Sequence, residues 1–447
     1  MPYLPRNALQ CLDRFVIAIF LALGLSAHAG GLTLTEAIKL TLQNSEEARL
    51  LNEKEVRLQA VRSEVLSGAL PHLQGYANAG RASSPFDPSA MGIPAPMGKF
   101  TQSRYSYGVE LSQPIYAFGR LGLAVRTAST QVESQNEANR RSRQELELQA
   151  LDAFYGLVMA QSRLLVLEAS GKRQKETVAF MESNFKMGAG MRSSVLLATA
   201  SLKAVEPERI RAARNVEAAR MALNRLLGRP IEDSLELDTI TTAMGSPLVT
   251  SETAVETALK QRADLSALRL QKEALQGFAK GARMQYRPSL GFQGKLGILA
   301  FDPDQLGDFK NNKEWQVGVG LQWNLFDGFS SSSRARQYDS DVRSLELVER
   351  QASAFARIEI ESAQREAEAA DTAYQAARQA RDAAFEALEL LSDDFRAGKG
   401  QITDLLSAEE GLRNAEFGAL ASRYQMARSQ AALRVALGFN LHEENAK

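Results

Sequence analysis

Apolar and polar residues alternate along four short stretches of the chain. From Trp315 to Trp323 every second residue is apolar, and the residues between them are Gln or Gly, with one Asn just beyond. Alternation with a period of two gives a β-strand one apolar and one polar face. A similar or weaker alternation occurs three more times, so we expect strands at about 71–80, 104–116, 288–299 and 314–326.

Very long helical stretches follow each pair of strands. Residues 119–185 contain no Pro, and residues 330–395 contain neither Pro nor Gly. At 1.5 Å per residue, a helix of ~66 residues would reach about 100 Å, which is too long for a globule. The segment 352–387 is rich in Ala, Glu, Gln and Arg, a composition typical of long helices packed side by side. A free coiled coil is the alternative interpretation of these stretches.

The two halves of the chain repeat one plan. Pro71 recurs as Pro288, while Gly188 and Gly190 recur as Gly398 and Gly400. Each half contains a helix, two strands and a long helical hairpin that reverses at the Gly-x-Gly sequence. We divide the chain into a first repeat at 30–228, a linker at 229–250 and a second repeat at 251–447. The hairpins are expected at 119–228 and 329–438, the second followed by a short tail.

The N-terminus has the features of a secretory signal peptide. Arg6 and Arg14 are followed by a short apolar run and by the sequence Ala27-His28-Ala29. This pattern predicts a signal peptide at 1–29, with a buried N-terminal helix as the alternative. No other stretch holds roughly 18 apolar residues, so we expect no transmembrane helix. Any membrane that the mature chain crosses must then be crossed by strands.

The strands themselves are typical of a transmembrane β-barrel. Aromatic residues occur in or next to them, as membrane-interface residues do: Trp315, Trp323, Tyr105 and Tyr107. A half-buried sheet in a soluble protein is the alternative. Four strands cannot close a barrel, because about eight are needed. Two copies would supply eight strands and three would supply twelve; the pattern does not choose, although a wide pore favours three.

Composition excludes several other functions. The chain has 53 Lys and Arg against 53 Asp and Glu, so no basic surface indicates nucleic acid as a partner. One Cys and three His offer no disulfide framework and no thiol or histidine-rich metal site. We find no phosphate-binding glycine loop and no nucleophile–His pair. We therefore expect no catalytic residues, no cofactor and no metal, and a protein that is not an enzyme.

Several motifs together resemble the TolC-like outer-membrane efflux protein family. They are the strand entries Leu70-Pro-His-Leu and Arg287-Pro-Ser-Leu, the strand exits Gln113 to Arg120 and Trp323 to Phe329, and the hairpin tip from Phe395 to Ala408. The resemblance spans essentially all of the mature chain. It implies a mixed α and β membrane protein: a homotrimer with a twelve-stranded transmembrane barrel in outer-membrane lipid, continued by a long helical barrel in the periplasm.

The same resemblance implies partners and site residues. The glycine tips, Gly188, Gly190, Gly398 and Gly400, would dock a periplasmic adaptor protein that connects the channel to an inner-membrane transporter. Asp404 and its counterpart Ser194 would lie at the periplasmic gate. Three copies of Asp404 would form a ring that favours cations, unless this residue only stabilises a helix start. Some family members latch the gate with an Arg near the second tip, where this chain has Gly400.

The expected function is therefore an outer-membrane channel-tunnel. It would export substrates as the outer component of a tripartite efflux or type I secretion system. The alternative from another class is a periplasmic coiled-coil adaptor or structural protein. Adaptors also carry long helical hairpins, but a duplicated strand–helix plan is not expected of them.

Overall fold

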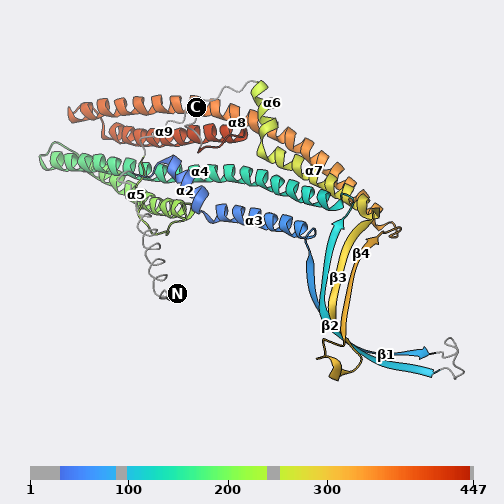
Figure 1. The fold of residues 1–447 in the computed structure, drawn as a ribbon. Coiled ribbons are helices and arrows are strands. Elements are labelled where there is room, and N and C mark those ends of the chain that lie inside the picture. The colour runs from blue at the N-terminus through green and yellow to red at the C-terminus, as the bar shows by residue number, and fades with distance from the viewer. Residues whose placement is uncertain (1–30, 87–97, 239–251, 443–447) are drawn as a thin grey trace, which may run out of the picture. The chain divides into compact units, whose positions relative to one another are not determined.

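The computed structural model describes residues 31–86, 98–238 and 252–442 (Figure 1). The expected signal peptide at 1–29 lies outside these residues. The chain divides into two compact units, which we describe separately. Unit 1 comprises Met1–Arg49, Arg143–Thr250 and Glu361–Lys447, and unit 2 comprises Leu50–Ser142 and Ser251–Ile360. The two longest helices contribute residues to both units.

Long helices and one sheet make up most of the described chain. In chain order the elements are α2 (Leu34–Asn44), α3 (Glu46–Ser67), β1 (His72–Phe86), β2 (Gly98–Tyr116), α4 (Arg120–Lys186), α5 (Arg192–Leu226), α6 (Glu252–Gln261), α7 (Ala263–Arg283), η2 (Met284–Tyr286), β3 (Ser289–Ala300), η3 (Pro303–Gln305), β4 (Lys313–Gln322), α8 (Ser330–Arg396) and α9 (Ile402–Ala436). The elements η2 and η3 are single 3-10 turns.

Corresponding helices of the two halves have equal lengths. Helices α4 and α8 have 67 residues each, and α5 and α9 have 35 each. In its described residues each half begins with two helices, where the sequence pattern predicts one. The first pair breaks at Ser45, whose Oγ accepts a hydrogen bond from the Ala48 N–H at 3.1 Å. The second pair breaks at Arg262, whose ψ of 130° is not helical.

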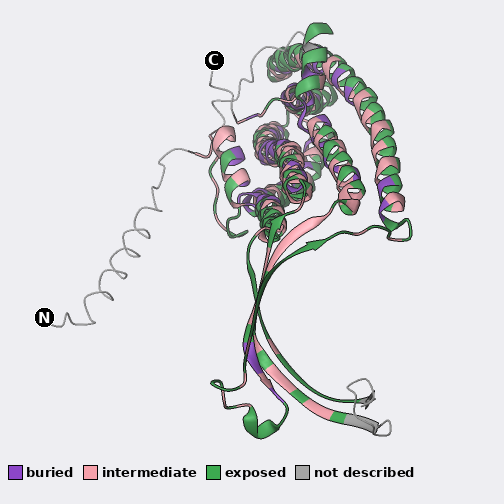
Figure 2. Cartoon of the chain, turned by 45° about the vertical axis from the view of Figure 1, so that its right-hand side comes forward, coloured by how far each residue is buried: buried purple, intermediate pink, exposed green. Residues whose placement is uncertain are grey.

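The core of unit 1 forms where α2 packs on the long helices. Thr33 and Glu36 cap the start of α2 with reciprocal hydrogen bonds, which fixes where this helix begins. One face of α2 is apolar and carries Ile38 into the core. The partners there come from α4, α5 and α9 and include Leu151, Phe154, Leu157, Leu223, Ala431 and Val435. Figure 2 shows many of the buried residues on the helices.

The described part of the expected linker at 229–250 is held to the rest of unit 1 by hydrogen bonds. The Leu32 N–H donates to the Glu236 carbonyl at 2.8 Å, and the Asp238 N–H donates to the Leu32 carbonyl at 3.0 Å. The Asn224 amide also donates to the Asp233 carbonyl at 2.8 Å. This segment is therefore held by hydrogen bonds to its backbone, which its acidic composition does not indicate. Residues 239–250 lie outside the described residues.

Unit 2 contains the sheet and a row of helical segments in matching order. The strands pair antiparallel in the order β1-β2-β3-β4 (Figure 1). Side-chain bonds join helix neighbours in the order α3-α4-α7-α8. Arg62 Nε donates to Ser129 Oγ at 3.0 Å, Ser134 Oγ donates to the Ala267 carbonyl at 2.9 Å, and Lys272 Nζ donates to Glu349 Oε2 at 2.6 Å. Each strand is therefore connected along the chain to one of these four helices, which form a single layer.

The strand bounds differ from the expected ones mainly at β1 and β2. These two strands pair from His72 opposite Ser112 out to Phe86 opposite Gly98. The alternation ends near residue 80, where small polar residues begin, but backbone pairing does not require alternating side chains. Strand β3 lies within one residue of its expected bounds, and β4 stops at Gln322.

Helix α4 meets a simple length and composition criterion for a membrane span. Among the described helices it alone is long and apolar enough to cross a membrane, judged by length and composition only. The sequence pattern predicts no such stretch outside the N-terminus. The same helix supplies Leu151, Phe154 and Leu157 to the core of unit 1, each with no exposed surface. Core helices also meet this criterion, so the finding by itself does not make α4 a membrane span.

Candidate channel wall and helix tips

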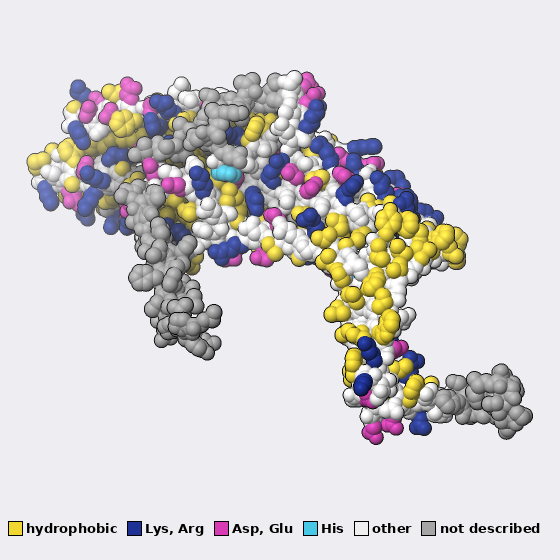
Figure 3. All heavy atoms as spheres, viewed as in Figure 1, with side chains coloured by type: hydrophobic (Ala, Val, Ile, Leu, Met, Phe, Trp, Pro, Cys, Tyr) yellow, Lys and Arg dark blue, Asp and Glu magenta, His cyan; other side chains and the backbone are white. Residues whose placement is uncertain are grey.

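One face of the sheet is apolar and exposed. On β4, the side chains of Trp315, Val317, Val319 and Leu321 lie on this face and are 61–67% exposed. Figure 3 shows hydrophobic side chains gathered over the strands. A contiguous apolar surface of this kind is costly in water and marks a contact with lipid or protein.

Aromatic residues lie at both ends of this face. Trp315 and Trp323 are eight positions apart, which corresponds to about 26 Å along a strand and matches the ~25 Å apolar band of transmembrane barrels. The Trp323 indole N–H donates to the Tyr286 carbonyl at 2.8 Å. Tyr105 and Tyr107 lie on the same face of β2, and the Tyr107 hydroxyl donates to the Leu306 carbonyl at 2.9 Å. Their contact with a membrane interface remains a proposal.

The opposite face of the sheet is polar. The strand register aligns one residue from each strand in a row: Gln74 with Glu110, Glu110 with Lys295, and Lys295 with Gln316. Because side chains alternate between faces, these four residues lie on the side away from Trp315. The sheet is therefore a wall with one face suited to lipid and the other to water.

Both outer edges of the described sheet are open. Strand β1 pairs only with β2, and β4 pairs only with β3. An open edge presents unpaired backbone N–H and C=O groups, which in hydrocarbon cost several kcal/mol each. A lipid environment for this wall thus requires further strands at both edges.

The two helix tips reverse the chain with the same backbone geometry. Gly188 and Gly398 have φ values of 77° and 76°, a conformation that favours glycine. The Ala189 N–H donates to the Asn184 carbonyl at 2.9 Å, and the Lys399 N–H donates to the Asp394 carbonyl at 2.8 Å. The glycines expected at the tips therefore form the turns themselves, and their docking of an adaptor remains a proposal.

The second glycine of each tip lies against the end of the preceding helix. A Cβ added at Gly190 would lie 3.1 Å from the Phe185 nitrogen, and one added at Gly400 would lie 3.1 Å from the Phe395 nitrogen. Close approach of the backbone explains why both positions lack a side chain. Gly400 also means that no side chain projects where the resemblance would place a latching Arg.

The two expected gate residues lie in the first turns of the returning helices. Asp404 is exposed near the start of α9, and Ser194 is half-buried near the start of α5. The Thr403 hydroxyl lies 3.4 Å from Asp404 Oδ1. An acidic residue here stabilises the helix start, and its exposure also leaves the carboxylate available to a pore.

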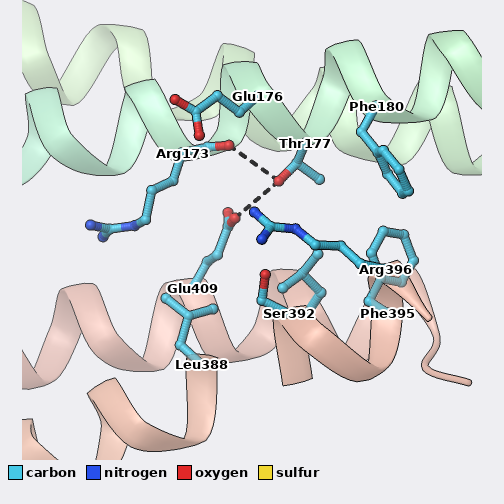
Figure 4. Close-up of a pocket in the computed structure, with 10 residues that line it drawn as sticks. Arg173, Glu176, Thr177, Phe180, Leu388, Ser392, Phe395, Arg396 and Glu409 are labelled. Carbon is cyan, nitrogen blue, oxygen red and sulfur yellow. Dashed lines mark hydrogen bonds between the residues drawn. The ribbon is translucent and has the colours of Figure 1, made fainter. Parts of the chain in front are cut away.

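A buried carboxyl group behind the tips is not predicted by the sequence pattern. Glu409 of α9 is only 3% exposed, and its Oε1 lies 3.3 Å from the Thr177 hydroxyl of α4 (Figure 4). The same hydroxyl lies 3.2 Å from the Arg173 carbonyl. These residues line a pocket of about 200 Å³ that also includes Phe180 and Phe395. The rings of these two phenylalanines pack edge to face, with centres 6.0 Å apart.

Burial raises the pKa of Glu409 above its ordinary value of 4.5, although Thr177, Arg173, Gln174 and Arg413 act in the opposite direction. A protonated Glu409 can donate to Thr177 Oγ1 while Thr177 donates to the Arg173 carbonyl, which satisfies both short contacts. Burial also raises the pKa of Glu416, which lies about two turns further along α9.

The contribution of Glu409 to the stability of unit 1 is therefore expected to decrease as pH rises. A carboxyl group with a raised folded-state pKa stabilises the fold fully below its unfolded pKa, and this contribution is lost as pH rises through the folded pKa. We predict that Glu409→Gln removes this contribution, so the melting temperature at about pH 7 minus that at about pH 4 is more positive in the variant than in the wild type. Thermal unfolding of both proteins at the two pH values measures this. The exposed neighbour Glu410 gives the control, Glu410→Gln, and an unchanged slope in Glu409→Gln would refute the prediction.

Comparisons with known proteins identify the class of fold. The structure is similar to the outer membrane channel CmeC of Campylobacter jejuni, with 19% identity, a TM-score of 0.76, and coverage of 91% of this chain and 85% of CmeC. It is also similar to the open state of the MtrE outer membrane channel of Neisseria gonorrhoeae, with 21% identity, a TM-score of 0.72, and coverage of 91% and 89%. The fold is that of a TolC-like outer-membrane channel with a helical tunnel in the periplasm.

The sequence comparison identifies the family. The sequence profile of the outer membrane efflux protein family matches residues 38–229 and 254–439, so this chain belongs to that family. The alkaline protease secretion protein AprF of Pseudomonas aeruginosa is 23% identical over 322 residues, which are 70% of this chain and 65% of AprF. Less than two thirds of AprF is therefore matched. The family and these relatives are channels of efflux or secretion systems, not enzymes.

Proposed function

We propose that three copies of this chain form a passive export duct through the outer membrane. The observation that carries this proposal is a sheet with an exposed apolar face, bounded by Trp315 and Trp323, and with two open edges. Lipid covers the apolar face, and neighbouring copies pair with the edges. Trp315, Trp323, Tyr105 and Tyr107 then lie near the membrane interfaces.

Strand number supports an oligomer of three. The described part of one copy contributes four strands, and a closed barrel needs about eight or more. Three copies supply twelve strands and leave an open lumen, whereas eight-stranded barrels are filled by side chains. The polar face, which includes Gln74, Glu110 and Gln316, lines this lumen.

The helices also have surfaces suited to contact between copies. Large apolar side chains on α5 and α8 are exposed in the single chain, including Leu196 at 59%, Phe355 at 61% and Ile358 at 62%. Exposed apolar groups on long helices are expected to pack against other helices. The equal lengths of α4 and α8, and of α5 and α9, further support two structural repeats, at 30–228 and 251–447, joined by the linker.

In this proposal the helix tips face the rest of an export system. Members of the family act as outer components that work with an adaptor and an inner-membrane pump. The exposed turns at Gly188, Gly190, Gly398 and Gly400 would dock the adaptor. Asp404, with Ser194, would line the periplasmic gate. The duct has no energy source of its own, and the pump would drive transport.

Conductance in planar bilayers tests the duct. The mature protein, purified from outer membranes in detergent, should insert and give discrete current steps that persist at either polarity. Folded protein that never produces a conductance would overturn the proposal.

The gate assignment gives a separate prediction. Three Asp404 carboxylates would attract cations and repel anions, so Asp404→Asn should lower the cation-to-anion permeability ratio by about two- to fivefold at low salt. The reversal potential in a KCl gradient measures this ratio. The exposed Glu410→Gln supplies a control with the same loss of charge on the same helix. An unchanged ratio in Asp404→Asn would leave this residue only its helix-start role.

A further inference from the structure

A tyrosine and a lysine form a cation–π pair on the polar face of the sheet. The Lys295 ammonium group lies 4.8 Å from the centre of the Tyr76 ring, within the range of such contacts. Tyr76 comes from β1 and Lys295 from β3, so the tyrosine side chain reaches across β2. The pair therefore depends on the register of three strands.

Two glycines make room for this arrangement. Gly108 of β2 and Gly297 of β3 lie directly opposite each other. A Cβ added at Gly108 would lie 2.9 Å from the Tyr76 hydroxyl, and one added at Gly297 would lie 2.5 Å from it. Any larger residue at either position would displace the ring. The Tyr76 hydroxyl is buried against these glycines, which limits the positions that the side chain can take.

Carboxylates flank the lysine on both neighbouring strands. Glu314 of β4 places Oε2 at 3.6 Å from Lys295 Nζ, and the two side chains are 31% and 29% exposed. Glu110 of β2 is the register partner of Lys295 and is exposed. We call Tyr76, Glu110, Lys295 and Glu314 the outer charged belt. It lies level with Trp315, because Leu296 is paired with that residue.

We propose that the outer charged belt is a second charge filter of the duct, inside its membrane-spanning part, and that it favours cationic over anionic solutes. This inference rests on the proposed function, since it requires the polar face to line a lumen. Each copy contributes two carboxylates and one ammonium group, so the belt has an excess of negative charge. Tyr76 is a positioning residue that holds the ammonium group against the wall.

The outer charged belt is far enough from other charges on the polar face to be electrostatically independent of them. Arg104 of β2 is the next charge along the polar face of that strand, opposite Gly80. It is four positions from Gly108, the β2 residue in the row of Glu314, or about 13 Å along the strand, which exceeds the ~8 Å screening length at physiological salt. Lys295 is therefore the cation that offsets the belt carboxylates.

Reversal potentials in planar bilayers test the filter. Lys295→Met removes the offsetting cation, so the cation-to-anion permeability ratio should rise by about two- to fivefold at ~0.01–0.1 M KCl. The difference should fade near ~1 M salt, where the screening length falls to ~3 Å. Glu110→Gln, a substitution at an exposed position, should lower the ratio. Because Glu110→Gln is expected to shift the permeability ratio in the opposite direction, it still tests the proposal if Lys295→Met does not assemble.

Lys313→Met is the matched control. Lys313 is opposite Ile298, on the apolar face of the same wall, so losing its charge should leave the ratio unchanged. The positioning role of Tyr76 has its own readout: Tyr76→Phe keeps the ring and should retain the wild-type ratio, whereas Tyr76→Leu should shift it. If Lys295→Met and Glu110→Gln channels both kept the wild-type selectivity, the proposed charge filter would be refuted, whereas the proposed duct would not. Wild-type protein that forms no channel would overturn the duct as well.

Discussion

Val319→Arg is expected to prevent assembly of the protein in the outer membrane. Val319 lies in the middle of β4 on the apolar face, opposite Phe292, and is 61% exposed in the single chain. An arginine facing lipid at the bilayer midplane costs about 2–4 kcal/mol, and in a trimer this cost is incurred in each copy. The amount of oligomer in purified outer membranes measures the effect.

The neighbouring position provides a control with the same charge. Gly318 lies on the polar face, and a side chain added there meets no atom within 4 Å. Gly318→Arg should therefore assemble at close to the wild-type level, since its charge faces water. Normal assembly of Val319→Arg would show that lipid does not contact this face.

Phe154→Ala should have the largest effect on the stability of unit 1. The Phe154 side chain has no exposed surface and packs edge-on against Tyr155, with ring centres 5.9 Å apart. Replacing a buried phenylalanine with alanine typically costs about 3–5 kcal/mol, because the removed atoms leave a cavity. Denaturant unfolding of the purified protein, followed by circular dichroism, measures the loss.

Phe439→Ala is the matched control for this substitution. Phe439 also belongs to unit 1 but is 53% exposed, so its truncation should cost far less. Equal losses from the two substitutions would mean that the core around α2, α4 and α9 does not govern the stability measured.

The sequence predicts the strands and long helices well where the pattern is local. Strand β4 follows from the alternation between Trp315 and Trp323, and the 67-residue length of α8 follows from the absence of Pro and Gly. The helix breaks at Ser45 and Arg262 do not follow from any such pattern. At Arg262 the guanidinium donates to Asp264 and Glu359, both at 2.7 Å, and the second contact comes from another helix. A single sequence does not indicate such a tertiary bond.

The same limit applies to the site. The glycines at the tips are predictable because a reversal of this kind favours glycine at positive φ. Glu409 is not, since an acidic residue on a helix normally faces water and only the packing of α4 against α9 buries it. For Lys295, alternation predicts the polar face, but its contact with Tyr76 requires the register of β1, β2 and β3. The local sequence pattern thus predicts the face of the sheet on which a side chain lies, whereas strand pairing determines which side chains are its neighbours.

The native mass of the protein extracted from outer membranes in detergent tests the central claim most directly. A shared barrel built from four strands per copy predicts a stable oligomer of about three protomers in the outer-membrane fraction. A soluble monomer in the periplasmic fraction would contradict the duct, because the apolar face and open edges of the sheet would then have neither lipid nor neighbouring strands to cover them.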